Sequence, residues 1–217
     1  MKMAPSHVSK QQFDAAHRLL QVVERLLKDG DSVISKVTGR KTSIEEWEQF
    51  PESEQEDLRT GFRYYYHSHP CPGSRAEHGH FHLFKRVGMG DQPSSYSHIL
   101  AIGVNGSALP TRFFSTNLWV TGETSQPAEV VSQFARDFIF DSPSVDPVAE
   151  WIREMLTLFS REVLELLHAR DSRCAELSIR RPGFADDRRT IQLAQVAINL
   201  PAKLLEIEGW QNEYQIN

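Results

Sequence analysis

Residues 62–69 read FRYYYHSH and residues 77–84 read EHGHFHLF, and these two runs decide how we expect the chain to fold. Five of the nine histidines of the chain lie in them, at 67 and 69 in the first run and at 78, 80 and 82 in the second, each two residues from the next. Residues two apart share one face of a β-strand. We therefore predict that the two runs pair as an antiparallel hairpin with the histidines on one face.

The short connection from residue 70 to residue 77 sets the register of this hairpin. It predicts three cross-strand pairs, namely His69 with His78, His67 with His80, and Tyr65 with His82. The other face carries apolar side chains, which we assign to the core: Tyr64, Tyr66, Phe81 and Leu83. A slip by one residue would send the rings to different faces, so the pattern specifies the register strongly.

Clustered imidazoles repel one another when protonated, and a bound cation removes that cost by keeping the rings neutral. A lone histidine on a strand usually hydrogen-bonds to a neighbour or to water, but two such runs joined by a short loop favour a metal site. The predicted ligands are His67, His69, His78, His80 and His82. Imidazole ligands suit several transition metals, and we expect iron or copper first and zinc as the alternative. One ion or two neighbouring ions are both compatible with the pattern.

Four other side chains are candidates for a role at this site. Tyr65 shares the ligand face and can donate a proton, or simply pack along its strand. Glu77 can bind the metal, act as a general base or orient a histidine, and the sequence does not separate these roles. Arg112 on a neighbouring strand can clamp a carboxylate of a substrate or form a surface salt bridge. His98 can add a further ring from the adjoining strand.

The rest of the chain predicts a single α+β domain over residues 1–217, with an antiparallel sheet of about four to six strands packed against several helices. We expect an N-terminal helix over about 9–29, opened by Ser9 and stopped by Gly30. A polar, turn-rich stretch follows, and then a sheet core over about 60–122 with strands at 98–104 and 111–120. A helical part covers about 126–178. The tail, 179–217, is ambiguous, with a possible strand near 190–200 and a short helix from Pro201.

Composition narrows the class of partner. A net charge of −5 with mixed signs argues against a nucleic-acid partner, whose phosphates need a basic surface. No stretch has the length and apolarity of a signal peptide or a membrane span, so we expect no membrane partner and a cytoplasmic location. Two cysteines, Cys71 and Cys174, fit a reducing compartment. A small molecule is the expected partner.

Residues 64–69 and 77–82, followed by 116–123 (TNLWVTGE), together resemble an uncharacterised bacterial family of unknown function. The resemblance covers the central third of the chain and implies no known activity. Our first hypothesis for function is therefore a metal-dependent enzyme, an oxidoreductase that uses iron or copper. The alternatives are a non-catalytic protein that stores, carries or senses a metal, and a zinc-dependent hydrolase.

Overall fold

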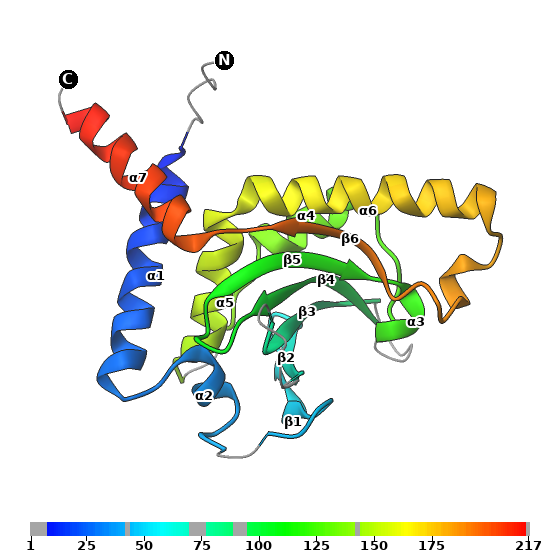
Figure 1. Cartoon of the computed structure of the whole chain (residues 1–217), viewed down its shortest axis with the longest axis horizontal. Helices are drawn as coiled ribbons and strands as arrows, with labels where there is room; N and C mark the ends of the chain where they lie inside the picture. The colour runs from blue at the N-terminus through cyan, green and yellow to red at the C-terminus, as the bar shows by residue number, and fades with distance from the viewer. Residues whose placement is uncertain (1–7, 42–43, 70–76, 89–94, 142–143, 216–217) are drawn as a thin grey trace.

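The structure is a computed structural model that describes residues 8–41, 44–69, 77–88, 95–141 and 144–215, with the backbone alone for 211–215. Within these residues, six strands form one antiparallel sheet, which is accompanied by seven α-helices and a 3₁₀-helix (Figure 1). The predicted α+β single-domain class is confirmed, as is the number of strands. No helix of the described part is long and apolar enough to cross a membrane.

The strands are β1 (Gln49–Asp57), β2 (Phe62–Ser68), β3 (Gly79–Val87), β4 (Ser95–Val104), β5 (Pro110–Thr116) and β6 (Gln192–Ala197). The helices are α1 (Lys10–Lys28), α2 (Val33–Val37), α3 (Leu118–Thr121), α4 (Ala128–Arg136), α5 (Pro147–Leu158), α6 (Ser160–Arg180), the 3₁₀-helix η1 (Phe184–Asp186) and α7 (Leu200–Gln215). Each strand pairs with its neighbours in chain order, from β1 to β6. The helices α3 to α6 lie between β5 and β6 in the chain, yet these two strands are hydrogen-bonded to each other.

The β2–β3 hairpin has the predicted register. His67 lies opposite His80, and Tyr65 lies opposite His82. The backbone amide of His69 donates to the carbonyl of His78 at 2.7 Å, which continues the ladder beyond the strand ends. The alternation of histidines therefore identified both the strands and their alignment.

The two faces of the sheet have different coverings. Along β2, buried and half-buried residues alternate strictly, as expected when one face meets the core. On the core face, the hydroxyl of Tyr64 donates to Asp146 at 2.8 Å, and Phe81 packs against Trp151 of α5 with ring centroids 5.5 Å apart. The helices thus cover the face opposite to His67 and His80.

The N-terminal helix follows the predicted boundaries. The hydroxyl of Ser9 accepts from the amide of Gln12, whose side chain accepts from the amide of Ser9 in turn, and this capping box begins α1. The chain leaves α1 through Gly30 at φ +72°, a conformation that glycine adopts without a Cβ clash.

The sheet is wider than the predicted core of 60–122. The strand β1 lies in the stretch expected to be polar and turn-rich, because pairing with β2 orders an edge strand that has little apolar character of its own. The strand expected over 111–120 ends at Thr116, where the side chain of Asn117 caps the short helix α3. The possible strand in the tail is β6, and it pairs with β5.

Candidate metal centre

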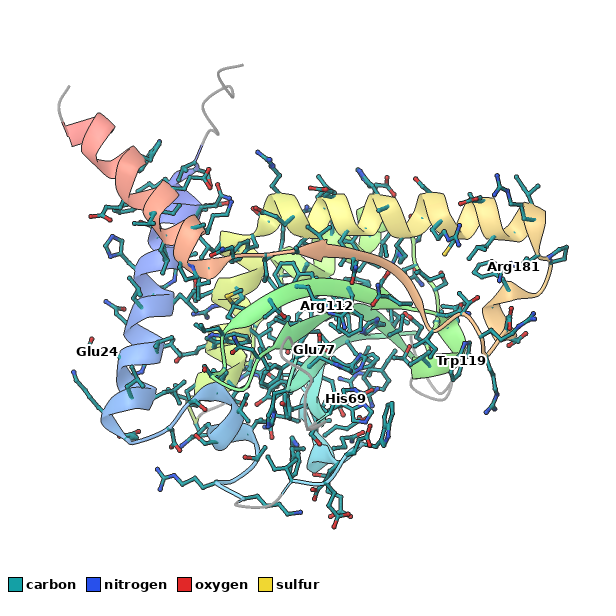
Figure 2. All side chains as sticks on the ribbon, viewed as in Figure 1. Glu24, His69, Glu77, Arg112, Trp119 and Arg181 are labelled. Atoms are coloured by element: carbon teal, nitrogen blue, oxygen red, sulfur yellow. The ribbon has the colours of Figure 1, made fainter. Side chains whose placement is uncertain are left out.

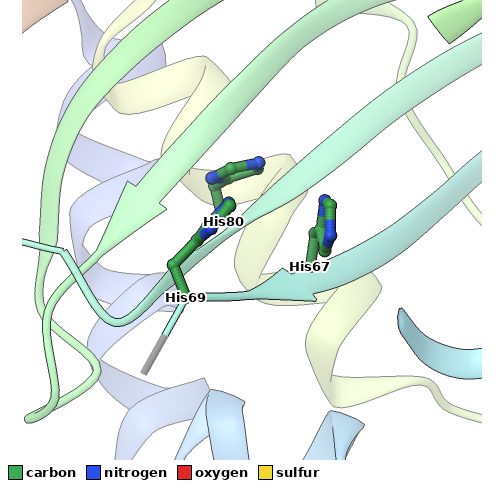
Figure 3. A group of neighbouring side chains, drawn as sticks. All are labelled: His67, His69 and His80. Carbon is green, nitrogen blue, oxygen red and sulfur yellow. The ribbon is translucent and has the colours of Figure 1, made fainter. Parts of the chain in front are cut away.

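Three imidazoles from the hairpin meet on the face of the sheet that the helices leave uncovered. His67 lies on β2, His69 directly after it and His80 on β3 (Figure 3). One ring nitrogen of each lies within 4.8 Å of the corresponding nitrogens of the other two. The ring centroids are 4.9 Å apart for His67 and His69, 4.8 Å for His69 and His80, and 5.6 Å for His67 and His80.

These separations can be compared with those that one ion requires. Metal–nitrogen bonds of about 2.0–2.1 Å at tetrahedral angles place the centroids of two ligating imidazoles about 5 Å apart. The three observed centroid distances lie around this value, although the nitrogens need to close by roughly 1 Å to reach bonding distance. Small side-chain rotations are therefore sufficient for the three rings to hold one ion.

Glu77 orients the His80 ring. Its Oε1 lies 2.9 Å from Nδ1 of His80, and its Oε2 accepts from Nε of Arg112 at 2.7 Å. A carboxylate that accepts from one ring nitrogen fixes the ring and leaves the other nitrogen, here Nε2, as the metal-binding atom. Arg112 also donates to the side chains of Gln192 and Gln195 at 2.7 and 2.9 Å.

Gly103 of β4 has no side chain and so leaves the space that the Glu77 carboxylate occupies. A Cβ built on this residue would lie 2.5 Å from Oε2 of Glu77, closer than real contacts allow. The missing side chain lets Glu77 lie over β4 and reach His80 and Arg112 together. Figure 2 shows Glu77, Arg112 and His69 close together at this end of the sheet.

Trp47, just before β1, lies against His67 and His69. Its ring centroid is 4.5 Å from that of His69 and 5.4 Å from that of His67, and its backbone hydrogen-bonds to the His67 ring. The residue has φ +69°, an unfavourable value for a side chain with a Cβ, and its amide donates to the carbonyl of Ser68 at 3.0 Å. The side chain is nevertheless 64% exposed, so Trp47 forms a wall at the open side of the cluster.

The electrostatics keep His67 and His69 neutral and Glu77 charged. Burial, followed by the neighbouring His80 and His69, lowers the pKa of His67 to about 4, and burial also lowers the pKa of His69. Burial opposes ionisation of Glu77, but the hydrogen bonds from His80 and Arg112 outweigh it and lower its pKa to about 2. Near neutral pH His67 and His69 thus offer unprotonated nitrogens, which metal ions require.

The remaining predicted ligands do not join this group. The Nδ1 atom of His78 lies 2.6 Å from the hydroxyl of Tyr66, a side chain that points to the opposite face, so the five rings do not converge on one point. His82 shares the face but pairs with His98, with 3.1 Å between Nδ1 of the first and Nε2 of the second. His98 is thus a sixth ring next to the predicted set.

Tyr65 lies beside His82, with ring centroids 5.0 Å apart. Burial, with a contribution from Glu54, raises the pKa of Tyr65 to about 12, so the phenol keeps its proton. The guanidinium of Arg112 is engaged by Glu77 and the two glutamines, and the clamping of a substrate carboxylate by this residue stays a prediction.

Sequence reasoning missed the contacts made by Trp47, Gly103 and Glu123. Glu123 accepts from the backbone amide of His98 at 2.6 Å, with a side chain that is 7% exposed. An aromatic residue in a polar stretch was the one signal for Trp47, and a glycine within an apolar strand was the signal for Gly103. Cys71 and most of the connection between β2 and β3 lie outside the described residues.

Comparisons with curated proteins and with solved structures found no match to this chain. A comparison with protein families found a match over residues 13–198 to a domain of unknown function, DUF6969. This range includes all six strands of the sheet. It also contains His67, His69 and His80. The chain therefore belongs to the family described as domain of unknown function DUF6969.

Proposed function

We propose that this protein is a metal-dependent enzyme whose ion is held by His67, His69 and His80, and that it is an oxidoreductase using iron or copper. The observation that carries the proposal is the convergence of the three rings together with the carboxylate of Glu77 on Nδ1 of His80. Histidine ligands in metalloenzymes are typically held in this way by a carboxylate or a backbone carbonyl.

The donor set supports a catalytic ion. Three protein ligands leave at least one coordination position for water or substrate, whereas structural sites are usually closed by four. The described ligands are all nitrogen atoms, which suits iron, copper and zinc. His67 and His69 are half-buried, so a small molecule can approach the ion from the side of Trp47.

The deciding experiment is metal analysis of protein purified without an affinity tag. We expect about one ion per chain, lost on His67→Ala or His80→Ala. The matched control is His78→Ala, which removes a histidine of the same run whose ring pairs with Tyr66 instead. Unchanged metal content in both cluster variants would refute the proposed ligands.

The identity of the ion separates the reaction classes. Iron or copper in the purified protein supports an oxidoreductase, and stoichiometric zinc would replace that proposal with a hydrolase. The second candidate function is metal handling without catalysis, which the partial exposure of His67 and His69 favours. Azide binding to the Cu²⁺-loaded protein distinguishes the two, since an open position gives a new charge-transfer band and a saturated site gives none.

A further inference from the structure

A second group of polar side chains lies next to the cluster on the same face of the sheet. His82 of β3 and His98 of β4 are each 2% exposed, and their facing nitrogens are 3.1 Å apart. At this distance one ring donates a proton and the other accepts it. The direction of that hydrogen bond determines which nitrogens of the two rings remain available.

The surroundings of the second His98 nitrogen settle the direction. Its Nδ1 lies 3.5 Å from Oγ1 of Thr116, and the ring makes a hydrogen bond with the backbone of Leu100 that favours a protonated nitrogen. The nearest oxygen of Glu123 is 3.9 Å from Nδ1, beyond hydrogen-bond distance. A backbone carbonyl only accepts hydrogen bonds. In the neutral ring the proton is therefore on Nδ1, and Nε2 of His98 is the acceptor.

The direction of this hydrogen bond determines the tautomer of His82. Its Nδ1 donates to His98, so a neutral His82 carries its lone pair on Nε2. The two nitrogens of an imidazole point away from each other, so Nε2 is directed away from β4. On that side the rings of Tyr65 and His67 have centroids 5.0 and 6.5 Å from that of His82, and His80 lies 4.7 Å away along β3.

We propose that Glu123 and His98 are positioning residues that hold His82 in its Nδ1–H tautomer, so that Nε2 accepts a hydrogen bond from a protic ligand of the metal ion. Water, an alcohol or an amine bound at the open coordination position has the required chemistry. The ligand role rests on the proposed function, whereas the tautomer is a property of the chain itself. The ring nitrogens that lie within 4.8 Å of one another belong to His67, His69 and His80 and not to His82, so we place His82 beside the ion.

Two features of the fold build this arrangement. A β-bulge shifts the β3–β4 register between Leu83 and Phe84, which places His98 opposite Phe84 and next to His82. Glu123 then binds the backbone amide of His98 at 2.6 Å and accepts from the hydroxyl of Thr121 at 3.3 Å. Burial lowers the pKa of His98 to about 3, so this ring is neutral near pH 7.

The test is ¹⁵N NMR of the histidine side chains in the metal-free protein at pH 7.5. We expect the Nε2 resonance of His82 at the shift of an unprotonated nitrogen and its Nδ1 resonance at that of a protonated one. His82 with its proton on Nε2 would overturn the proposal. This measurement on the unaltered protein decides the question even if a variant fails to fold.

Variants test the roles of the two positioning residues. His98→Phe removes the acceptor, and we expect His82 to change to the Nε2–H form that histidine usually prefers. Glu123→Gln removes the negative charge near His98 and is expected to cause a partial shift in the same direction. Glu77→Gln is the matched control, because it faces His80 and leaves the His82 tautomer unchanged. A His82 tautomer that is insensitive to both His98→Phe and Glu123→Gln contradicts their positioning role.

The result is separable from the proposed metal site. If His67→Ala and His80→Ala leave metal content unchanged while His82 remains Nδ1–H, the metal proposal fails and the tautomer inference stands. If those variants lose the metal but His82 carries its proton on Nε2, the inference alone fails.

Discussion

The outer cluster of His67, His69 and His80 and the inner pair of His82 and His98 contain the same kind of side chain on the same face of the same sheet. In the outer cluster, His80 is oriented by Glu77 and His67 by the backbone of Trp47, and no hydrogen bond joins one ring to another among the contacts of the described residues. In the inner pair the two rings satisfy each other.

The difference shows that a histidine count does not give a ligand count. A ring whose orienting partner is a carboxylate or a carbonyl keeps one nitrogen free for a cation. A hydrogen bond between two rings occupies one nitrogen of each ring. Exposure differs in the same direction, since His67 and His69 are half-buried and His80 is 8% exposed, while His82 and His98 are 2% exposed. We expect the two groups to respond to substitution in opposite ways.

The largest effect should separate His80→Ala from His82→Ala. We expect His80→Ala to weaken metal binding by more than about 100-fold, beyond the 10–100-fold cost of losing an outer partner. His82→Ala should change affinity by less than about 10-fold but destabilise the fold by about 2–4 kcal/mol, since it opens a cavity and leaves His98 without its partner. Chelator competition measures the first quantity and urea unfolding of the metal-free protein the second. Equal losses of affinity in the two variants would remove the distinction.

The carboxylates of Glu77 and Glu123 provide the next test of the comparison. Glu77→Ala should lower metal affinity by about 10–100-fold, because the His80 ring loses the acceptor that orients it. Glu123→Ala should lower affinity by less than about 3-fold, since Glu123 contacts His98 and none of the three ligands. Competition titrations of both variants under one condition give the ratio. A stronger effect at Glu123 would mean that the inner pair holds the ion.

The pH dependence of stability sharpens the comparison for Glu123. Burial raises the pKa of Glu123 to about 7, against the opposing hydrogen bond from His98 and the charge of Arg170. The folded state therefore keeps a proton that the unfolded state releases between about pH 4.5 and 7, so this group weakens the fold as pH rises through that window. Glu123→Gln abolishes the titration, and its stability relative to the unaltered protein should rise by roughly 2 kcal/mol from pH 5 to pH 8.

Urea unfolding of the metal-free protein at the two pH values measures this change. Glu129→Gln on the exposed surface of α4 is the control and should show a much smaller pH dependence. A stability difference for Glu123→Gln that does not vary with pH would contradict a raised pKa at this position.

The smallest effect is expected at Gly103. A methyl group there would lie 2.5 Å from Oε2 of Glu77, so the carboxylate must move and its hold on His80 weakens. We expect Gly103→Ala to reduce metal affinity by about 2–10-fold, less than Glu77→Ala. Gly106→Ala in the adjacent turn is the matched control, because a Cβ there meets nothing within 4 Å. Identical metal affinities for these two glycine variants would show that Glu77 does not depend on the space that Gly103 leaves over β4.

Local periodicity was enough to predict the hairpin but not its neighbours in the sheet. The alternation in β2 and β3 specified the pairing of His67 with His80, because a slipped register would expose Tyr66 or Phe81. The strand β1 carries no comparable alternation, since its order comes from the edge of β2. The position of His98 was equally hidden, because the bulge that turns it toward His82 depends on how β3 and β4 pair.

The alternation of residues 62–69 and 77–84 is sufficient to predict the β2–β3 register and the face on which most of the histidines lie, because side chains of a strand alternate with a period of two whatever surrounds them. Which rings meet depends on contacts made in the folded protein. His78 turns to Tyr66, His82 pairs with His98 from β4, and Glu77 reaches His80 over Gly103 with Arg112 from β5 behind it. Hydrogen-bond partners select the orientation of each ring. His98 and Arg112 come from β4 and β5, outside the hairpin, and no local pattern in the hairpin records them.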